Sequence, residues 1–289
     1  MNEAQASEAS RLLLALARRN ARVYAAHPDA RAIIVTGSAA EGVSDFYSDL
    51  DMILYYDRLP SEDELLAACQ QNEGKGRHLL GRAGDEEVMD AYAVNGVECQ
   101  CAHTTIAAWE RDMATVLEQL DVTTPLQKAL SGMLHAIPLH GEPLVRQWQA
   151  RLADYPEALA RTMVEHYLAV FPVWGLQDYI ASRDATIWVH EVLVETAHHL
   201  LGVLAGLNRQ YYSSFQFKRL HHFVARLNIT PPHFADRLEA LFRADIASAA
   251  AHVEELVREM VRLVDEHMPQ VDTSHLRAQL DWRHQAWRR

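Results

Sequence analysis

The chain has 289 residues and a mass of 32.7 kDa, and 49% of its residues are hydrophobic while 23% are charged. This balance excludes a disordered or fibrous protein. The 39 acidic residues outnumber the 27 lysines and arginines, so the formal net charge is -12. Because nonspecific binding of DNA or RNA needs many cationic contacts with phosphates, we expect no long nucleic-acid partner. The same charge favours a cationic small molecule.

The sequence also predicts the compartment. No apolar run approaches the roughly 20 residues that span a bilayer, and the polar N-terminus MNEAQASEAS is unlike a signal peptide. The cysteines Cys69, Cys99 and Cys101 are too few for a disulfide framework. The Cys99-x-Cys101 pair has no second Cys or His pair at zinc-finger spacing. We therefore expect a reduced, cytoplasmic protein with no membrane partner and no structural zinc.

The first part of the chain mixes helical and strand periodicities. Leucines at helical spacing predict a helix over 7–26, and the β-branched run AIIVT predicts a buried strand over 32–36. Glycines predict a loop-rich stretch over 74–84. The other elements expected here are a strand over 49–56, a helix starting at Ser61, a hairpin of 90–94 and 97–103 around Asn95-Gly96, and a helix from Thr104 or Thr105 towards Leu120.

Beyond Pro125 the periodicity is almost entirely helical. We therefore expect an α+β fold, in which a small mixed sheet with flanking helices occupies residues 1–125 and an all-α helical bundle occupies 126–289. Expected breaks lie at Pro138–Pro143, at Tyr155-Pro156, at 208–214 and at 230–232. The helices predicted between these breaks cover 163–179, 187–207, 216–227 and 234–268.

One segment of the first part carries a pattern suited to phosphate and metal chemistry. The predicted strand at 32–36 ends in Gly37-Ser38, where glycine permits close backbone approach and the serine can hold a phosphate. After ten intervening residues, Asp49 and Asp51 open the next strand. Being two strand positions apart, they point to the same side, roughly 7 Å apart at the backbone. Carboxylates so placed can share Mg²⁺ together with substrate phosphates.

A later strand offers a third carboxylate. Glu98 begins the run VECQCAH, and alternation places Glu98 and Gln100 on one face of that strand, with Cys99 and Cys101 on the other. The cysteine face can belong to the core. Glu98 is then available either as an exposed surface charge or as the third acid of a site with Asp49 and Asp51.

The order Gly37-Ser38, Asp49-Leu50-Asp51 and a strand acid resembles the nucleotidyltransferase superfamily typified by DNA polymerase beta. The similarity covers residues 31–105 and is strongest to small-molecule nucleotidyltransferases of the aminoglycoside and lincosamide type. In that family the Gly-Ser turn holds the triphosphate and the paired acids bind Mg²⁺. The third acid, here Glu98, assists metal binding or acts as base. More loosely, the run LNRQY at 207–211 followed by Lys218 resembles a recurring stretch of the C-terminal domains of such enzymes.

Two further residues have alternative interpretations. Ser48, directly before Asp49, either hydrogen-bonds a phosphate or closes the preceding turn. Lys218 is either a surface charge or a cation that binds the triphosphate. We include both with Gly37 and Ser38 among the candidate nucleotide-binding residues.

The resemblance implies an enzyme that transfers a nucleoside monophosphate to a hydroxyl of a small molecule and releases pyrophosphate. The expected co-substrate is ATP or another NTP, with two Mg²⁺ ions, and the expected acceptor is cationic, such as an aminoglycoside-type antibiotic. We expect a monomer or a homodimer. Two alternatives stay open: an AMP- or UMP-transferase acting on a protein, and a non-catalytic nucleotide-binding regulator or antitoxin.

Overall fold

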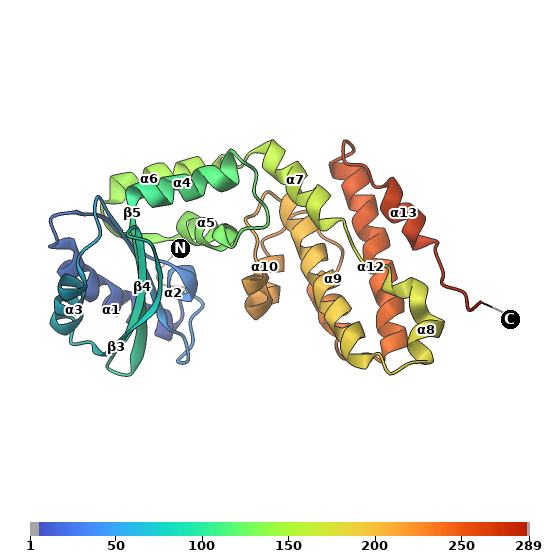
Figure 1. The fold of residues 1–289 in the computed structure, drawn as a ribbon, viewed down its shortest axis with the longest axis horizontal. Helices are drawn as coiled ribbons and strands as arrows, with labels where there is room; N and C mark the ends of the chain where they lie inside the picture. The colour runs from blue at the N-terminus through green and yellow to red at the C-terminus, as the bar shows by residue number, and fades with distance from the viewer. Residues whose placement is uncertain (1–5, 288–289) are drawn as a thin grey trace. The chain divides into compact units, whose positions relative to one another are not determined.

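The computed structural model describes residues 6–287, which form two compact units (Figure 1). The first unit holds the chain up to Gln119 together with Ala129–Asp154, and the second holds Leu120–Lys128 together with the chain from Tyr155 onward. The predicted boundary near residue 125 falls in the short segment where the chain passes from one unit to the other and back. The assignment of domains to 1–125 and 126–289 stays a prediction.

The first unit is built on a six-stranded mixed sheet, which confirms the predicted α+β class. Its strand order is β3-β4-β5-β2-β1-β6, and β2 and β5 are parallel while the other neighbouring strands are antiparallel. The strands are β1 Ala30–Val35, β2 Leu50–Tyr56, β3 Lys75–Ala83, β4 Glu87–Val94, β5 Val97–Thr105 and β6 Ile137–His140. The helices are α1 Glu8–Ala25, α2 Gly37–Glu41, α3 Glu62–Gln71, α4 Ile106–Leu117 and α6 Glu142–Ala153, together with α5 Leu126–His135, whose first three residues belong to the second unit.

One face of this sheet packs against α1. The helix starts at Ser7, whose hydroxyl accepts a hydrogen bond from the Ser10 amide at 3.0 Å. Its apolar stripe buries Leu13, Leu14 and Tyr24 against alternate residues of the strands. The strand residues in this core include Ile33, Val35, Leu50, Met52, Leu54, Tyr92, Cys99 and Cys101.

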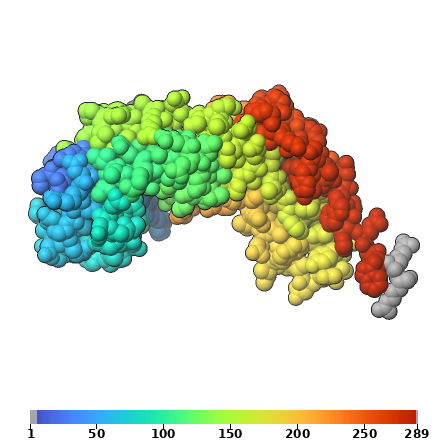
Figure 2. Space-filling view, turned by 45° about the horizontal axis from the view of Figure 1, so that its top comes forward, coloured from blue at the N-terminus to red at the C-terminus, as the bar shows by residue number. Residues whose placement is uncertain are grey.

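The opposite face is covered in part by α4 and α6. Tyr55 of β2 is fully buried there, with its ring centroid 5.7 Å from that of Trp109 on α4 and 4.8 Å from that of Trp148 on α6. Such aromatic contacts add to the free energy gained from burying the rings. In the space-filling view, the surface of α4 is green and that of the β4–β5 hairpin is teal (Figure 2).

Both edge strands differ from the sequence predictions. The glycine-rich stretch predicted as a loop contains β3, which pairs with β4 through two register shifts, between Lys75 and His78 and between Leu79 and Gly81. Those irregularities accommodate glycines that weaken a regular strand. The predicted break at Pro138 contains the short strand β6, where Pro138 is tolerated because β6 is an edge strand.

The second unit is built of helices, as predicted. Its long helix α9 Thr186–Leu207 packs against α7 Glu157–Tyr167 and α12 Ile246–His267, and the predicted helix over 187–207 is confirmed. Within residues 6–287, no helix combines the length and apolarity needed to cross a membrane. The shorter elements are η2 Val173–Leu176, α8 Gln177–Ala181, η3 Ser214–Arg219, α10 Leu220–Val224, α11 Phe234–Ala240 and α13 Ser274–Leu280.

Three predicted helices of this unit are wrong in extent. The helix predicted over 163–179 ends at Tyr167, because Pro172 cannot continue it, and η2 and α8 follow. The helix predicted over 234–268 is two helices, since Asp245 caps a new start by accepting from the Ser248 amide at 3.0 Å. The segment 216–227 is mainly the 3-10 helix η3 followed by α10.

Gly141 fixes the passage from β6 into α6 and provides a test of this packing. Its φ is +63°, and a Cβ there would overlap the carbonyl oxygen of Arg31 on β1. We expect Gly141→Ala to lower the free energy of unfolding by about 1–3 kcal/mol, as overpacking does, measured by urea denaturation. Gly81→Ala, which has open space around the added carbon, is the control and should change little. Equal midpoints for both variants would contradict this packing.

Candidate functional site

The parallel pairing of β2 with β5 places the predicted acids on one face of the sheet. Leu50 lies opposite Cys99 and Asp51 lies opposite Gln100. Leu50 and Cys99 are fully buried in the core against α1. Because strand side chains alternate, Asp51 and Gln100 point to the other face, as the sequence predicted.

Gln100 ties two of the carboxylates together. Its side-chain amide donates to Asp49 Oδ2 at 3.1 Å and to Glu98 Oε1 at 2.9 Å. Asp49 is half-buried and Glu98 is exposed. The structure therefore brings Asp49 and Glu98 to the same end of two adjacent strands, with Asp51 next along β2.

The glycine turn lies directly against Asp51. Gly37 has a φ of +65°, and a Cβ at this position would overlap Asp51 Oδ2. The Thr36 amide donates to the Asp51 carbonyl at 3.1 Å, which fixes the turn to the strand. Only glycine provides both this backbone conformation and this approach. Gly37 and the carboxylates thus form one group of residues, which we call the acidic site: Gly37, Asp49, Asp51, Glu98 and Gln100.

Ser38 belongs to a chain of serines beside the acidic site. Its hydroxyl lies 2.9 Å from the hydroxyl of Ser44. The Ser44 amide donates to Ser10 Oγ at 2.9 Å, and Ser7 Oγ donates to the Ser44 carbonyl at 2.7 Å. These contacts fasten the turn after β1 to the start of α1. A phosphate contact by Ser38 stays a prediction.

Ser48 closes a tight turn before β2. Its hydroxyl donates to Asp45 Oδ1 at 3.1 Å and accepts from the Asp45 amide at 3.0 Å. The Tyr47 amide donates to the same carboxylate oxygen at 2.9 Å. The turn-closing interpretation of Ser48 therefore matches its contacts, and the phosphate contact stays a prediction.

Lys218 lies in η3 of the second unit. Its ammonium is 5.4 Å from the ring centroid of Phe215, and the ammonium of Lys128 is 3.8 Å from the same centroid. Both lysines are exposed. Cation–π contacts of this kind are weak at exposed positions, so they leave the ammonium groups accessible to an anion. Binding of triphosphate by Lys218 stays a prediction.

A second pair of acids, absent from the sequence predictions, lies on the same sheet face. Asp112 of α4 is hydrogen-bonded to Glu87 of β4, and Thr104 Oγ1 donates to Glu87 Oε1 at 3.5 Å. Burial, followed by the charge of Glu87, raises the pKa of Asp112 to about 6. The two acids are 25 residues apart in sequence. Only the β4–β5 pairing and the packing of α4 bring them together, so the sequence offers no local signal for them.

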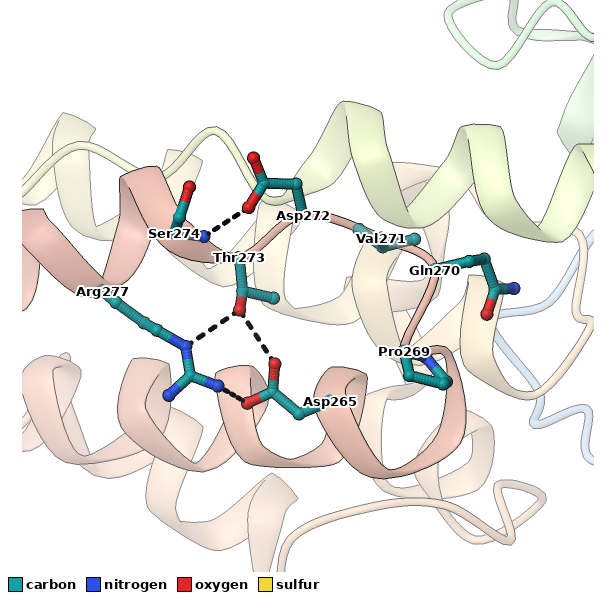
Figure 3. Close-up of a pocket in the computed structure, with 8 residues that line it drawn as sticks. All are labelled: Asp265, Pro269, Gln270, Val271, Asp272, Thr273, Ser274 and Arg277. Carbon is teal, nitrogen blue, oxygen red and sulfur yellow. Dashed lines mark hydrogen bonds and ion pairs between the residues drawn. The ribbon is translucent and has the colours of Figure 1, made fainter.

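A pocket of about 430 Å³ lies between α12 and α13 of the second unit (Figure 3). Its lining contains none of the predicted site residues. Arg277 is ion-paired with Asp265, and Thr273 Oγ1 donates to Asp265 Oδ1 at 2.8 Å. Asp272 accepts from the Ser274 amide at 2.8 Å. The contacts of Asp265 with Arg277 and Thr273 thus join the two helices.

No protein family and no curated protein match the sequence. Among solved structures, the chain is similar to a nucleotidyltransferase-like protein from Exiguobacterium sibiricum 255-15. The TM-score is 0.42 and the identity is 11%, over 87% of this chain and 78% of that chain. At this level the similarity assigns neither a family nor an activity.

The Asp112–Glu87 pair predicts a pH-dependent stability. The pKa of Asp112 is about 6 in the folded protein against an ordinary value of 3.8, so the folded state holds the proton more tightly. Stability is therefore lost as pH rises between these values. We expect Asp112→Asn to stabilise the protein at pH 8 by about 1 kcal/mol, the full shift being discounted because Asp112 is half-exposed.

Urea denaturation at several pH values measures this effect. The gain from Asp112→Asn should shrink towards pH 4. Glu87→Gln, which removes the neighbouring charge, should also weaken the pH dependence. Parallel pH profiles for the wild type and Asp112→Asn would contradict the assignment.

Proposed function

We propose that the protein is a Mg²⁺-dependent nucleotidyltransferase that moves AMP from ATP to a hydroxyl of a small molecule and releases pyrophosphate. The observation that carries the proposal is the acidic site itself. Asp49, which directly precedes β2, lies with Asp51 of β2 and Glu98 of β5 at one end of a parallel strand pair, and Gly37 lies against Asp51.

The donor set suits a hard cation. Carboxylate oxygens are the ligands that Mg²⁺ prefers, usually with substrate phosphates completing its shell. The ions would be held by Asp49, Asp51 and Glu98. Gln100 contacts one carboxylate oxygen of Asp49 and one of Glu98. Bound Mg²⁺ supplies charge neutralisation for the triphosphate.

The chain's own groups position the reaction. Glu98, exposed beside Asp49, accepts the proton of the acceptor hydroxyl, whose oxygen forms a bond with the α-phosphorus. The bond from the α-phosphorus to the bridging oxygen breaks, and pyrophosphate leaves. The phosphates are bound by Gly37 and Ser38, which follow β1, and by Ser48, which precedes Asp49. Lys218 is a further cation for the phosphates. Catalysis then rests on positioning and charge neutralisation.

The acceptor is proposed to be cationic because the chain carries a net charge of -12. An aminoglycoside-type antibiotic has the required amines and hydroxyls. Labelled nucleotide transferred to a small molecule would support this class. Label on a protein band would indicate a protein AMP- or UMP-transferase, and binding without transfer would indicate a regulator or antitoxin.

Calorimetric titration of ATP, GTP, CTP and UTP tests the nucleotide site. We expect Mg²⁺-dependent binding by the wild type and its loss in the Asp49→Asn/Asp51→Asn variant, because the metal-binding carboxylates are gone. Asp57→Asn, at the opposite end of β2 and ion-paired with Arg31, is a control that keeps the site. The proposal would be refuted if none of the four nucleotides bound, or if the wild type and the Asp49→Asn/Asp51→Asn variant bound them equally.

Lys218→Ala tests the proposed contact of Lys218 with phosphate. Loss of a charged contact with phosphate should raise the Kd for the Mg²⁺–nucleotide about tenfold, since hydrogen bonds to charged groups contribute about 1.5–3 kcal/mol. Lys75→Ala removes an equally exposed lysine from β3 and should leave the Kd unchanged. The same titration measures both variants. Equal affinities would assign Lys218 to the solvated surface.

A further inference from the structure

The core of the first unit contains a second group of potential metal ligands. Asp90 of β4 pairs in register with Cys101 of β5, and His103 follows on the same side of β5. Their exposed fractions are 1%, 0% and 1%. One carboxylate oxygen, the thiol sulfur and one ring nitrogen all lie within 4.8 Å of one another. We call Asp90, Cys101 and His103 the buried triad.

Two atoms of the buried triad face each other in a long ion pair. Asp90 Oδ1 and His103 Nε2 are 3.5 Å apart, and within the described residues neither has a hydrogen-bond partner. So long a contact satisfies these buried polar atoms only in part, which costs free energy. A species placed between them that binds both atoms would remove this cost.

The other polar atoms of the same side chains are already held. Arg77 Nε donates to Asp90 Oδ2 at 2.5 Å, and the hydroxyl of Tyr56 lies 3.2 Å from His103 Nδ1. Outer contacts of this type orient carboxylate and imidazole ligands in metal sites. They leave Asp90 Oδ1 and His103 Nε2, which lie 3.5 Å apart, for a shared ligand.

We propose that the buried triad binds a zinc ion. Cysteine, histidine and aspartate are the three ligand types of protein-bound Zn²⁺. Ligand atoms about 2.0–2.3 Å from a tetrahedral ion are roughly 3.3–3.8 Å from one another, which matches the 3.5 Å between Asp90 Oδ1 and His103 Nε2. The Zn–S bond forms as the Cys101 thiol gives up its proton to solvent.

The surroundings balance the charge of such an ion. Arg77 is ion-paired with both Glu62 and Asp90. Taken together, the charges of Arg77, Glu62, Asp90, a Cys101 thiolate and Zn²⁺ cancel. The Tyr24 hydroxyl, 3.8 Å from Cys101 Sγ, is placed to donate to the sulfur. The charge of the ion is thus compensated inside the core.

This zinc would have three protein ligands and a fourth position for a water, and it would be separate from the acidic site. The buried triad lies on the sheet face that packs against α1, while Gln100 and Asp51 lie on the opposite face. The ion would join β4 to β5, and through Tyr56 and Glu62 it would be linked to β2 and α3. Its loss should destabilise the sheet rather than remove a reacting group.

Metal content and cobalt substitution of the full chain test the proposal. We expect about one equivalent of zinc in desalted protein from zinc-supplemented expression. Protein refolded from denaturant and chelator should bind one equivalent of Co²⁺ and show a thiolate-to-Co²⁺ charge-transfer band. Wild-type protein that lacks zinc and gives no such band would overturn the proposal and leave an Asp90–His103 ion pair.

A pair of cysteine variants identifies the ligand. Cys101→Ser should lose the charge-transfer band and bind Co²⁺ at least about 100-fold more weakly. Cys99→Ser changes an equally buried cysteine of the same strand outside the buried triad and should keep the band. The Asp49→Asn/Asp51→Asn variant should keep it too. A charge-transfer band that survives Cys101→Ser, or that is lost only in Cys99→Ser, would refute the assignment. If Cys101→Ser does not fold, the Co²⁺ titration of the wild type decides whether the buried triad binds a metal.

Discussion

The first unit depends on the register between the parallel strands β2 and β5. Leu50 opposite Cys99 fills the core, and Asp51 opposite Gln100 therefore points away from it. A slip of one residue on either strand would turn carboxylates into the core and apolar side chains out of it. The energy of burying Leu50 and Cys99 thus fixes the acids in place, although no acid contributes to that burial.

The acidic side chains on the two faces of the sheet have different surroundings. On the face opposite α1, Asp49 and Glu98 keep access to solvent and accept hydrogen bonds from the same Gln100 amide. On the α1 face, Asp90 is almost fully buried and is compensated by Arg77. Burial by itself would raise the pKa of Asp90, but the side chain of His103 and then the guanidinium of Arg77 hold it below its usual range. The sheet therefore has the solvent-accessible carboxylates of Asp49 and Glu98 on one face and the buried carboxylate of Asp90 on the other.

The sequence predicted those features that depend on a few neighbouring residues, namely a helix cap, a hairpin turn and the alternation of strand side chains. Ser61 caps α3 through a capping box, and Asn95-Gly96 turns the β4–β5 hairpin, both as predicted. The faces of Asp49, Asp51 and Glu98 follow from alternation alone. β3 could not be predicted in this way, because its glycines favour a loop and only pairing with β4 makes it a strand. The meeting of Asp90 with His103, and of Glu87 with Asp112, likewise depends on contacts between distant segments.

The two outer strands of the sheet also affect how the molecule behaves in a concentrated solution. An open strand edge is a template on which another chain can add a strand. Here β3 is interrupted by two register shifts and carries Lys75, Arg77 and Arg82, while β6 has four residues, one of them Pro138. Charges, bulges, shortness and proline all oppose edge-to-edge pairing. The irregular edges that obscured these strands in the sequence therefore protect the protein against aggregation by strand addition.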